Sequence, residues 1–400
     1  MVHIAALMMV KNEKKRLHVT LESVKGFADS IVMFDTGSTD NTIQIARDFC
    51  NVNNIPFRLT EGDFVDFSTS RNVSLEFADT FDDIDYILLL DTNDELRGGE
   101  FLRKFCEEHK DEDNHTGFLV AQEWWSGQYD KYYNMRLVKA RKGWRYKGRI
   151  HEWMKDTSLP DGKQPEVLRI QDKTVIYQDR TQDDDKTCSR FVRDKELLLQ
   201  DHRDDPTEPR TAFYLAQTCS CLNQQGDALY YYKLRSTLEG FQEEKFHAFL
   251  RIGDILKVLN HPWHDIMGYY MKAFEHSARA EPLLKIAEYY KDQKQWHLAF
   301  SFINLACELT YPEHCILFVD KLAYDYKRWH ILGIVGFYCN KMVEGKVGCL
   351  RALEFNANSQ IDKDNLKFYE NKAKEIVQST IREAQKPSHR KGKKGKKHRK

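Results

Sequence analysis

The sequence predicts an α/β domain with a mainly parallel sheet, followed by an all-α domain of helical repeats. In the first half, short apolar runs alternate with helix-like stretches, which is typical of β-α-β units. In the second half, small and aromatic residues recur about every 35 residues between Arg210 and Pro312. That period is typical of repeats made of two helices each.

Length and charge agree with two domains and a distinct tail. Four hundred residues are more than one ordinary core supports, and 41% hydrophobic residues are enough for real cores. The 61 basic and 61 acidic residues cancel, but residues 386–400 hold nine Lys or Arg and no acid. The rest of the chain is therefore mildly acidic. The tail is expected to be disordered and to make weak, non-specific contacts with polyanions.

The compartment is predicted from two absences in the sequence. No apolar run approaches the roughly 18 residues of a membrane span, and the first residues lack the pattern of a signal peptide. The nine cysteines contain no CxxC pair, and an odd number favours a reducing compartment. We therefore expect a cytoplasmic protein, in the host cytoplasm if it is viral.

Three predicted strands open the chain. Apolar runs at residues 4–10, 30–35 and 56–60 predict the strands, and apolar residues spaced by three and four predict the helices between them. The second strand ends in Asp35, which could bind a base or ribose, or could only support the next helix. Ser68 is the expected cap of the third helix.

Residues 86–96 combine a buried strand with a polar cluster. The first five of these residues are apolar or aromatic, and Asp91, Asn93 and Asp94 follow at the carboxyl end of the predicted strand. In an open α/β sheet, ligands bind at this end. Oxygen ligands so close together can hold a hard divalent cation, although an acidic run is also common as a solvated turn.

Four motifs occur in order along the first part of the chain. They are Met9-Val10-Lys11-Asn12-Glu13, Asp35-Thr36-Gly37-Ser38-Thr39-Asp40-Asn41-Thr42, Asp66-Phe67-Ser68 with Arg71-Asn72, and Leu90-Asp91-Thr92-Asn93-Asp94-Glu95-Leu96. This series resembles the motifs of glycosyltransferase family 2 over about the first 155 residues. The resemblance implies the GT-A fold, the Rossmann-like α/β fold of nucleotide-diphospho-sugar transferases.

The resemblance also implies roles for single residues, with a UDP-sugar as the expected donor. The residues matched to the nucleotide site are Val10, Asn12, Glu13, Asp35, Arg71 and Asp91. Asp91 and Asn93 match the Asp-x-Asp motif that binds Mn²⁺ or Mg²⁺ and the diphosphate. Because Asn93 replaces the second acid, the cation would be held less strongly, and Asp94 could supply the missing carboxylate.

Two later segments add candidates. Residues 144–152 resemble the Gly-x-Ile-His-Glu segment of the family, which implies His151 as a metal ligand, although a lone His is more often a core or surface residue. Lys147 and Arg149 could offset charge on the departing diphosphate. Trp124 and Trp125 could stack on a sugar ring or belong to the core.

The general base and the closing helix are left open by the sequence. If the reaction inverts, a carboxylate must take the acceptor proton, and the candidates are Glu123, Asp130 and Glu152. Arg190 and Arg193 lie on a charged helical stretch that could close over the nucleotide or could be a solvated face.

The expected domains are a GT-A domain at 1–185, a connecting helix and linker at 186–209, repeats resembling tetratricopeptide repeats at 210–380 and the tail at 381–400. The repeats offer a surface for an extended partner, while a fourth unit, from about 312 to 353, is too irregular to assign.

Together these features predict a metal-dependent transferase that moves a hexose, with glucose favoured, to a hydroxyl group of a protein or peptide. The sequence pattern of the repeat domain most resembles that of bacterial and giant-virus members of the family. This resemblance suggests that the acceptor is the glycosylated hydroxylysine of a collagen-like chain. One alternative is a catalytically decayed domain that serves as a scaffold for the repeats. Another is nucleic-acid binding by the tail.

Overall fold

The computed structural model describes residues 1–112, 114–124, 132–160, 163, 165–171, 173–179 and 187–384. Contacts divide the chain into two compact units. The first contains Met1–Ala278 and Tyr311–Lys321, and the second contains Arg279–Thr310 and the described part of Leu322–Lys400. The predicted domain limits rest on changes of composition and pattern along the sequence, whereas the two units are defined by contacts. The predicted limits therefore stay a prediction.

The first unit holds all the strands of the described chain. They are Ile4–Val10 (β1), Ser30–Asp35 (β2), Phe57–Glu61 (β3), Tyr86–Leu90 (β4), Asp94–Arg97 (β5), Gly117–Trp124 (β6), Tyr132–Lys139 (β7), Trp144–Lys147 (β8), Trp153–Asp156 (β9), Val167–Arg169 (β10) and Val175–Gln178 (β11). Strands β1, β2 and β4 are buried along nearly their whole length, which explains their continuous apolar sequences. The predicted strands at 4–10, 30–35 and 86–90 are confirmed.

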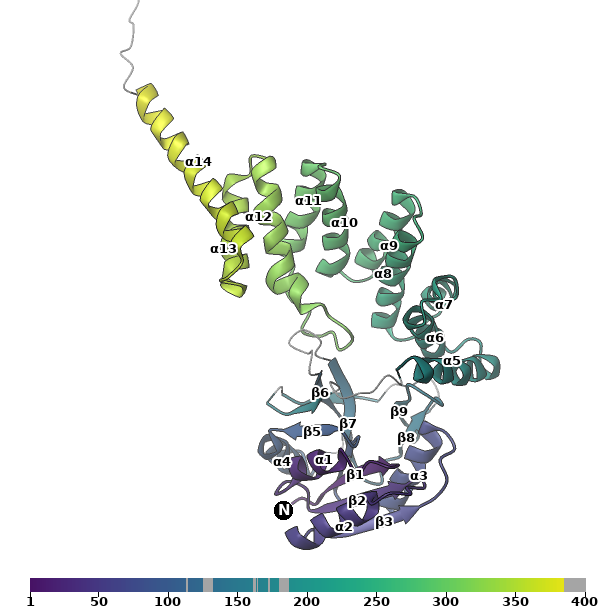
Figure 1. Cartoon of the computed structure of the whole chain (residues 1–400). Helices are drawn as coiled ribbons and strands as arrows, with labels where there is room; N and C mark the ends of the chain where they lie inside the picture. The colour runs from purple at the N-terminus through teal and green to yellow at the C-terminus, as the bar shows by residue number, and fades with distance from the viewer. Residues whose placement is uncertain are drawn as a thin grey trace, which may run out of the picture. The chain divides into compact units, whose positions relative to one another are not determined.

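The main sheet has the strand order β3-β2-β1-β4-β7-β6-β11-β5, and β10 pairs with β6. Strands β3, β2, β1 and β4 run parallel, while β7 is antiparallel to both β4 and β6. The chain builds outward from β1 through β2 to β3 (Figure 1). It then returns to place β4 on the other side of β1. The gap between β1 and β4 is therefore the point at which the strand order reverses.

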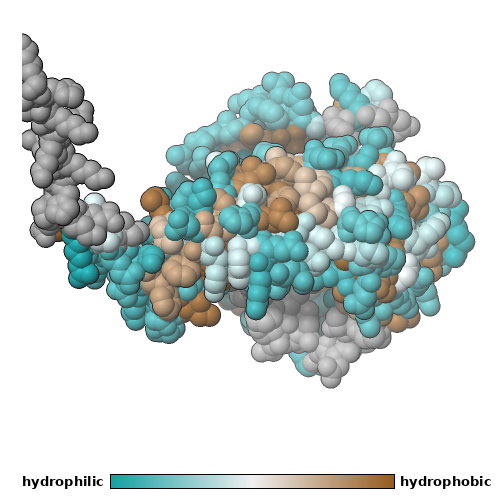
Figure 2. Space-filling view, turned by 90° about the horizontal axis from the view of Figure 1, so that it is seen from above, coloured by the Kyte–Doolittle hydropathy of each residue, from teal (hydrophilic) through white to brown (hydrophobic). Residues whose placement is uncertain are grey.

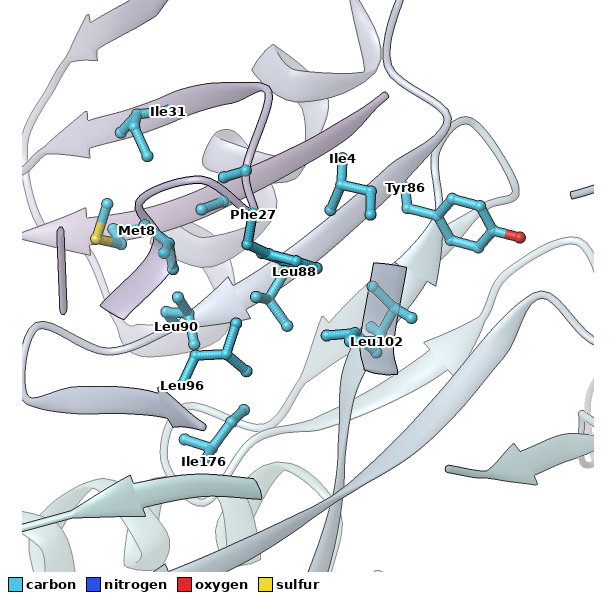
Figure 3. Packing of buried hydrophobic residues seen from close by; sticks show 14 of the residues in the cluster. Ile4, Met8, Phe27, Ile31, Tyr86, Leu88, Leu90, Leu96, Leu102 and Ile176 are labelled. Carbon is cyan, nitrogen blue, oxygen red and sulfur yellow. The ribbon is translucent and has the colours of Figure 1, made fainter. Parts of the chain in front are cut away.

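Helices cover both faces of this sheet. They are Leu17–Val24 (α1), Thr42–Asn53 (α2), Phe67–Asp79 (α3) and Gly99–Glu108 (α4). Side chains of α1, α2 and α4 pack with Ile4, Met8 and Leu88 on one face, as Figure 3 shows around Phe27 and Leu102. On the other face, α3 and the β8-β9 hairpin cover alternate residues of β1 and β4. The core thus holds the parallel strands in fixed register.

The start of α3 differs from the prediction. Its N-cap is Asp66, whose Oδ1 accepts a hydrogen bond from the Thr69 backbone N–H at 2.7 Å. The predicted cap, Ser68, lies inside the first turn and donates its hydroxyl to Asp66 at 3.0 Å. Asp66 has the extended backbone that an N-cap needs, so the helix begins two residues earlier than a cap at Ser68 predicts.

The first unit continues with helices at Thr187–Asp204 (α5), Pro209–Cys221 (α6), Gln225–Thr237 (α7), Gln242–Val258 (α8) and Trp263–His276 (α9). Helix α6 packs on α7, and α8 packs on α9. The returning segment 311–321 contacts this unit through Ile316 and Leu317, whose backbone N–H groups donate to Glu243. These two helix pairs match the first two predicted repeats.

The second unit contains Ala280–Asp292 (α10), Trp296–Glu308 (α11), the π-helical turn Ala323–Lys327 (η1), Arg328–Tyr338 (α12), Met342–Phe355 (α13) and Gln360–Ala384 (α14). Helix α10 packs on α11, and α12 packs on α13. The region from 312 to 353, which the sequence left unassigned, therefore contains a fourth helix pair. Gly333 and Gly348 permit the close approach of α12 and α13, because a Cβ at either would meet backbone or Cys349 atoms at under 3 Å.

The surface of the molecule carries both hydrophobic and hydrophilic residues (Figure 2). Figure 2 shows one face of the molecule, on which hydrophobic residues gather in patches among hydrophilic ones. No helix in the described part of the chain is long and apolar enough to cross a membrane. Eight cysteines are free thiols: Cys50, Cys106, Cys219, Cys221, Cys307, Cys315, Cys339 and Cys349.

Candidate active site

The carboxyl ends of β1, β2 and β4 meet at one edge of the sheet. These strands are neighbours in the sheet, and Val10 of β1 pairs with Asp35 of β2 in register. The edge lies where the strand order reverses, which is where open α/β sheets bind ligands. The three predicted motifs that follow these strands are thereby brought together.

Asp35 presents one free oxygen at this edge. Its Oδ2 accepts hydrogen bonds from the backbone N–H groups of Gly37 at 3.0 Å and Ser38 at 2.7 Å. Its Oδ1 is buried and has no hydrogen-bond partner among the residues that the structure describes. A buried acceptor without a donor costs about 1–3 kcal/mol, so a ligand N–H or O–H placed there would be stabilised.

The loop after β1 is tied to the loop after β2. Asn12 has a φ of 57°, and its Oδ1 accepts the backbone N–H of Thr39 at 2.7 Å. The backbone N–H of Glu13 donates to the Thr42 hydroxyl at 2.7 Å. Burial raises the pKa of Glu13, partly offset by a hydrogen bond with Thr92 in the loop after β4. Asn12 and Glu13 thus line the same edge as Asp35 and Asp91.

The turn after β4 points Asp91 and Asp94 in different directions. Asp94 is fully buried, and its carboxylate accepts hydrogen bonds from the Asp91 backbone N–H at 2.8 Å and from Gln178 Nε2 at 2.5 Å. Burial raises the pKa of Asp94. Asp94 therefore shapes the turn, whereas the Asp91 side chain remains 30% exposed and faces two arginines.

Arg71 and Arg136 hold the two oxygens of Asp91. Arg71 Nη2 lies 2.6 Å from Asp91 Oδ1, and Arg136 Nη2 lies 3.1 Å from Asp91 Oδ2. Arg136 also lies 3.7 Å from Asp94. Burial favours the neutral carboxyl, but the two guanidinium groups outweigh it and hold the pKa of Asp91 well below its usual range. Asp91 is thus a firmly ionised carboxylate.

Glu152 completes the cluster on the other side of Arg71. Its Oε1 accepts a hydrogen bond from Arg71 Nε at 2.7 Å, and its side chain is 15% exposed.

His151, directly before Glu152, stacks its imidazole on Tyr214 of α6 with the ring planes 9° apart. Burial, together with the nearby Arg210 and Arg190, lowers the pKa of His151 to about 3. The imidazole is therefore neutral at ordinary pH.

The remaining predicted residues lie at varied positions. Lys147 and Arg193 are exposed, and Arg190 is exposed but close enough to His151 to act on its charge. Glu123 is half-buried near the end of β6, opposite Tyr177 of β11. Asp130 and Trp125 lie outside the described residues.

Arg149, predicted to offset charge on the departing diphosphate, forms ion pairs with two carboxylates of α5, and its predicted role stays a prediction. Its guanidinium pairs with Asp201 at 2.5 Å and Asp204 at 2.7 Å on α5. Trp124 likewise has a structural partner, because its indole N–H donates to the Tyr132 hydroxyl at 2.9 Å.

Sequence reasoning missed Arg136. This residue lies on β7, the neighbour of β4, and no motif marks it. The one available signal is a charged residue at an inward-facing position of a strand that continues with Leu137 and Val138. Such a position indicates a buried ion pair, since an unpaired buried charge is very costly.

The predicted metal ligands are arranged for a divalent cation only in part. Asp91 and Asn93 offer carboxylate and amide oxygens in one turn, and cations that bind nucleotides commonly take only one or two protein ligands besides phosphate oxygens. Asp94 accepts a hydrogen bond inside the turn, and His151 is stacked on Tyr214. Within the described ranges, no group of three or more His, Cys, Asp or Glu is arranged for a metal. The metal roles of these four residues stay predictions.

The fold and its edge define a class of protein. A Rossmann-like sheet with acids after β1, β2 and β4, extended by a mixed β7-β6-β11-β5 portion, is the GT-A fold of glycosyltransferases. Residues 6–172 match the family model described as glycosyl transferase family 2.

The relatives agree with a second, helical part. A TPR repeat-containing protein of Synechococcus elongatus is 29% identical over 238 residues, which are 57% of this chain and 54% of that protein. The chain thus spans about half the length of the curated relative that it matches. The helix pairs of the second half are tetratricopeptide-like repeats.

Solved structures of both kinds resemble the chain. One contains residues 1–349 of TarS from S. aureus in complex with UDP-GlcNAc, with 13% identity, coverage of 64% of this chain and 81% of that one, and a TM-score of 0.36. Another is the C-terminal part of a TPR repeat-containing protein from Cytophaga hutchinsonii, with 15% identity, coverage of 45% and 65%, and a TM-score of 0.36.

Proposed function

We propose that the protein transfers a hexose, with glucose favoured, from a UDP-sugar to a hydroxyl group of a protein or peptide. The nucleotide would lie across the ends of β1, β2 and β4. The observation that carries this proposal is the buried Oδ1 of Asp35, which lacks a donor at the edge where such folds bind ligands. A uracil N–H or a ribose hydroxyl supplies the missing donor.

The charges of the cluster suit a diphosphate leaving group. Arg71 and Arg136 place two guanidinium groups beside Asp91, and such cationic groups stabilise the charge that develops as a sugar leaves its diphosphate. If Asp91 and Asn93 hold Mn²⁺ or Mg²⁺, the cation supplies further charge neutralisation. It would compete with the two arginines for the same carboxylate oxygens.

Two of the three candidate bases lie in the described structure. Glu152 is oriented by its hydrogen bond from Arg71, whereas Glu123 lies near the end of β6. A general base must reach the acceptor hydroxyl within hydrogen-bond distance, and its proton transfer is worth roughly 10²- to 10⁴-fold in rate. Because Glu152 already accepts a bond from Arg71, we favour it for positioning and propose Glu123 first as the base.

The acceptor proposal is supported by the repeats. Stacked helix pairs form surfaces that bind extended chains, and the acidic body of the protein suits a basic and polar peptide. A collagen-like chain with glycosylated hydroxylysine is one such acceptor.

The experiment is mass spectrometry of candidate peptides after incubation with the intact protein and a panel of nucleotide sugars. The panel would contain UDP-glucose, UDP-galactose, UDP-GlcNAc and GDP-mannose, and the peptides would include collagen-like sequences with free and glycosylated hydroxylysine. We expect an added hexose mass with a UDP-sugar. Transfer from GDP-mannose alone would contradict the donor proposal, and labelling of unrelated small alcohols alone would contradict the acceptor proposal.

A scaffold without catalysis is the second candidate. It is favoured by Asn93 in place of an acid and by the two arginines on both oxygens of Asp91. Such a scaffold would release no UDP from any UDP-sugar, even when the repeats bind a peptide tightly. Release of UDP by the intact protein, lost in an Asp91→Asn variant, would exclude it.

A further inference from the structure

The loop of residues 148–152 lies next to the Arg71 cluster and is conformationally strained. His151 has a φ of 50°, in the left-handed region, which costs a residue with a Cβ about 1–2 kcal/mol. Glu152, the partner of Arg71, follows it directly. Surrounding contacts must therefore hold this backbone conformation.

Helix α6, the first helix of the repeats, supplies those contacts. The Tyr214 ring stacks on the His151 imidazole with centroids 4.0 Å apart. Arg210 Nε donates a hydrogen bond to the His151 carbonyl oxygen at 3.2 Å. Both contacts act on the strained residue itself, one on its side chain and one on its backbone.

Arg210 is itself fixed by the next helix pair. Its Nη1 lies 3.1 Å from Oε1 of Glu244 on α8, and Glu244 also accepts a hydrogen bond from Arg235 at 3.2 Å. Glu244 and Arg235 are almost fully buried. The Arg210 guanidinium further lies over the rings of Tyr214 at 4.9 Å and Trp153 at 5.5 Å. This network leaves Arg210 little freedom to move away from the loop.

The same loop is joined to the helix that carries Arg71. The backbone N–H of Phe67, the first residue of α3, donates to the Arg149 carbonyl oxygen at 3.2 Å. On its other side, the Arg149 backbone N–H donates to Asp201 of α5 at 3.1 Å. A displacement of α5 or α6 would therefore reach both Arg71 and its partner Glu152.

We propose that Tyr214 and Arg210 are positioning residues of the donor site, which hold loop 148–152 and, through Glu152, the guanidinium of Arg71. This inference rests on the proposed function, because it assigns the first repeat to the same site. The first repeat is then part of the catalytic machinery as well as part of the acceptor-binding surface. Donor affinity depends on it even when no acceptor is bound.

The test uses the intact chain and four variants. Tyr214→Ala removes the stacked ring, Tyr214→Phe keeps it, and Tyr230→Ala is a matched control on α7, where Tyr230 is 62% exposed. Arg210→Lys is a second variant that keeps a charge but loses the directed bond to His151. The measurements are the Kd for UDP by calorimetry and backbone hydrogen exchange of the peptide that spans 148–154, without nucleotide.

We expect Tyr214→Ala and Arg210→Lys to raise the Kd by about 10-fold, and Tyr214→Phe and Tyr230→Ala to change it by less than about 2-fold. Exchange should rise at 148–154 and at the start of α3 in the first two variants, without a general rise elsewhere. Unchanged UDP affinity with unchanged local exchange in Tyr214→Ala would overturn the inference. If the wild-type protein binds no UDP, the proposed function fails, and the exchange data still decide whether α6 holds the loop.

Discussion

Arg71 and Asp91 form a tight ion pair, with Nη2 and Oδ1 2.6 Å apart, between α3 and the turn after β4. The pair joins two motifs that lie 20 residues apart in the chain. Burial opposes ionisation of both groups, and their mutual attraction more than offsets it, so the pKa of Arg71 is raised and that of Asp91 is lowered. The candidate site is therefore organised around a charge pair before any ligand arrives.

Removal of Asp91 is predicted to destabilise the fold as well as to stop catalysis. Asp91→Ala removes the carboxylate that Arg71 and Arg136 share, although Arg71 keeps Glu152 and Arg136 keeps Asp94 as partners. Loss of these charge-assisted hydrogen bonds at a partly buried site costs about 1.5–3 kcal/mol. Urea unfolding should show this loss in the free energy of unfolding. Glu95→Ala, at an exposed pair with Arg97 on β5, is the control and should cost under about 1 kcal/mol. Equal stability of the two variants would show that the Asp91 cluster is not a buried network.

Replacement of Asp35 is predicted to weaken nucleotide binding without unfolding the protein. In Asp35→Asn the side-chain oxygen can still accept the bonds from Gly37 and Ser38, but an amide NH₂ then faces the ligand donor. A lost hydrogen bond with an unsatisfied group costs about 1–3 kcal/mol, so the Kd for UDP should rise by about 10-fold or more. The control variant Asp48→Asn, on the exposed face of α2, should leave the Kd for UDP unchanged. If Asp35→Asn binds UDP with the Kd of the wild type, Asp35 does not contact the nucleotide.

Removal of divalent cations is predicted to lower sugar transfer, and a second acid is predicted to strengthen the metal site. Dialysis against EDTA tests the first statement. Asn93→Asp restores the Asp-x-Asp motif and adds a negative ligand, so the Mn²⁺ concentration for half-maximal activity should fall several-fold. Full activity in EDTA, or an unaltered Mn²⁺ titration in Asn93→Asp, would count against a cation at this turn.

His151 is predicted to make stability depend on pH. Its pKa is about 3 in the fold, against about 6.5 in an unfolded chain, so the unfolded state takes up the proton first as the pH falls. Stability from this residue is present above pH 6.5 and is lost as the pH falls from about 6.5 to 3, by at most about 1.4 kcal/mol per pH unit. Urea unfolding of His151→Gln between pH 7 and 4 should show a shallower loss than the wild type. A parallel decline of both proteins would contradict the buried, neutral imidazole.

Much of the fold could be predicted because it depends on local pattern. The apolar runs at 4–10 and 86–90 are strands buried on both faces, and their ends carry Asn12 and Asp91 to one edge. The helix pairs follow from repeated small residues, such as Ala216 and Ala287, that are fully buried between helices. The fourth pair was hidden because α12 begins through a π-helical turn, which disturbs the helical period.

The rest depends on tertiary contacts that no local pattern records. Arg136 reaches Asp91 across neighbouring strands, and Asp94 turns inward because Gln178 of β11 offers a donor. His151 resembled a metal ligand in sequence, but its stack on Tyr214 depends on a helix 63 residues further along the chain. The roles of Glu123, Lys147, Arg190 and Arg193 stay predictions.

Release of UDP from UDP-glucose by the intact protein, with Mn²⁺ present and no acceptor added, tests the central claim most directly. Many transferases slowly pass their sugar to water, so a bound donor reveals itself even when the acceptor is unknown. The account predicts steady UDP release that saturates with donor and falls by at least about 10-fold in Asp35→Asn. No release from any UDP-sugar, together with no calorimetric binding of UDP, would contradict it.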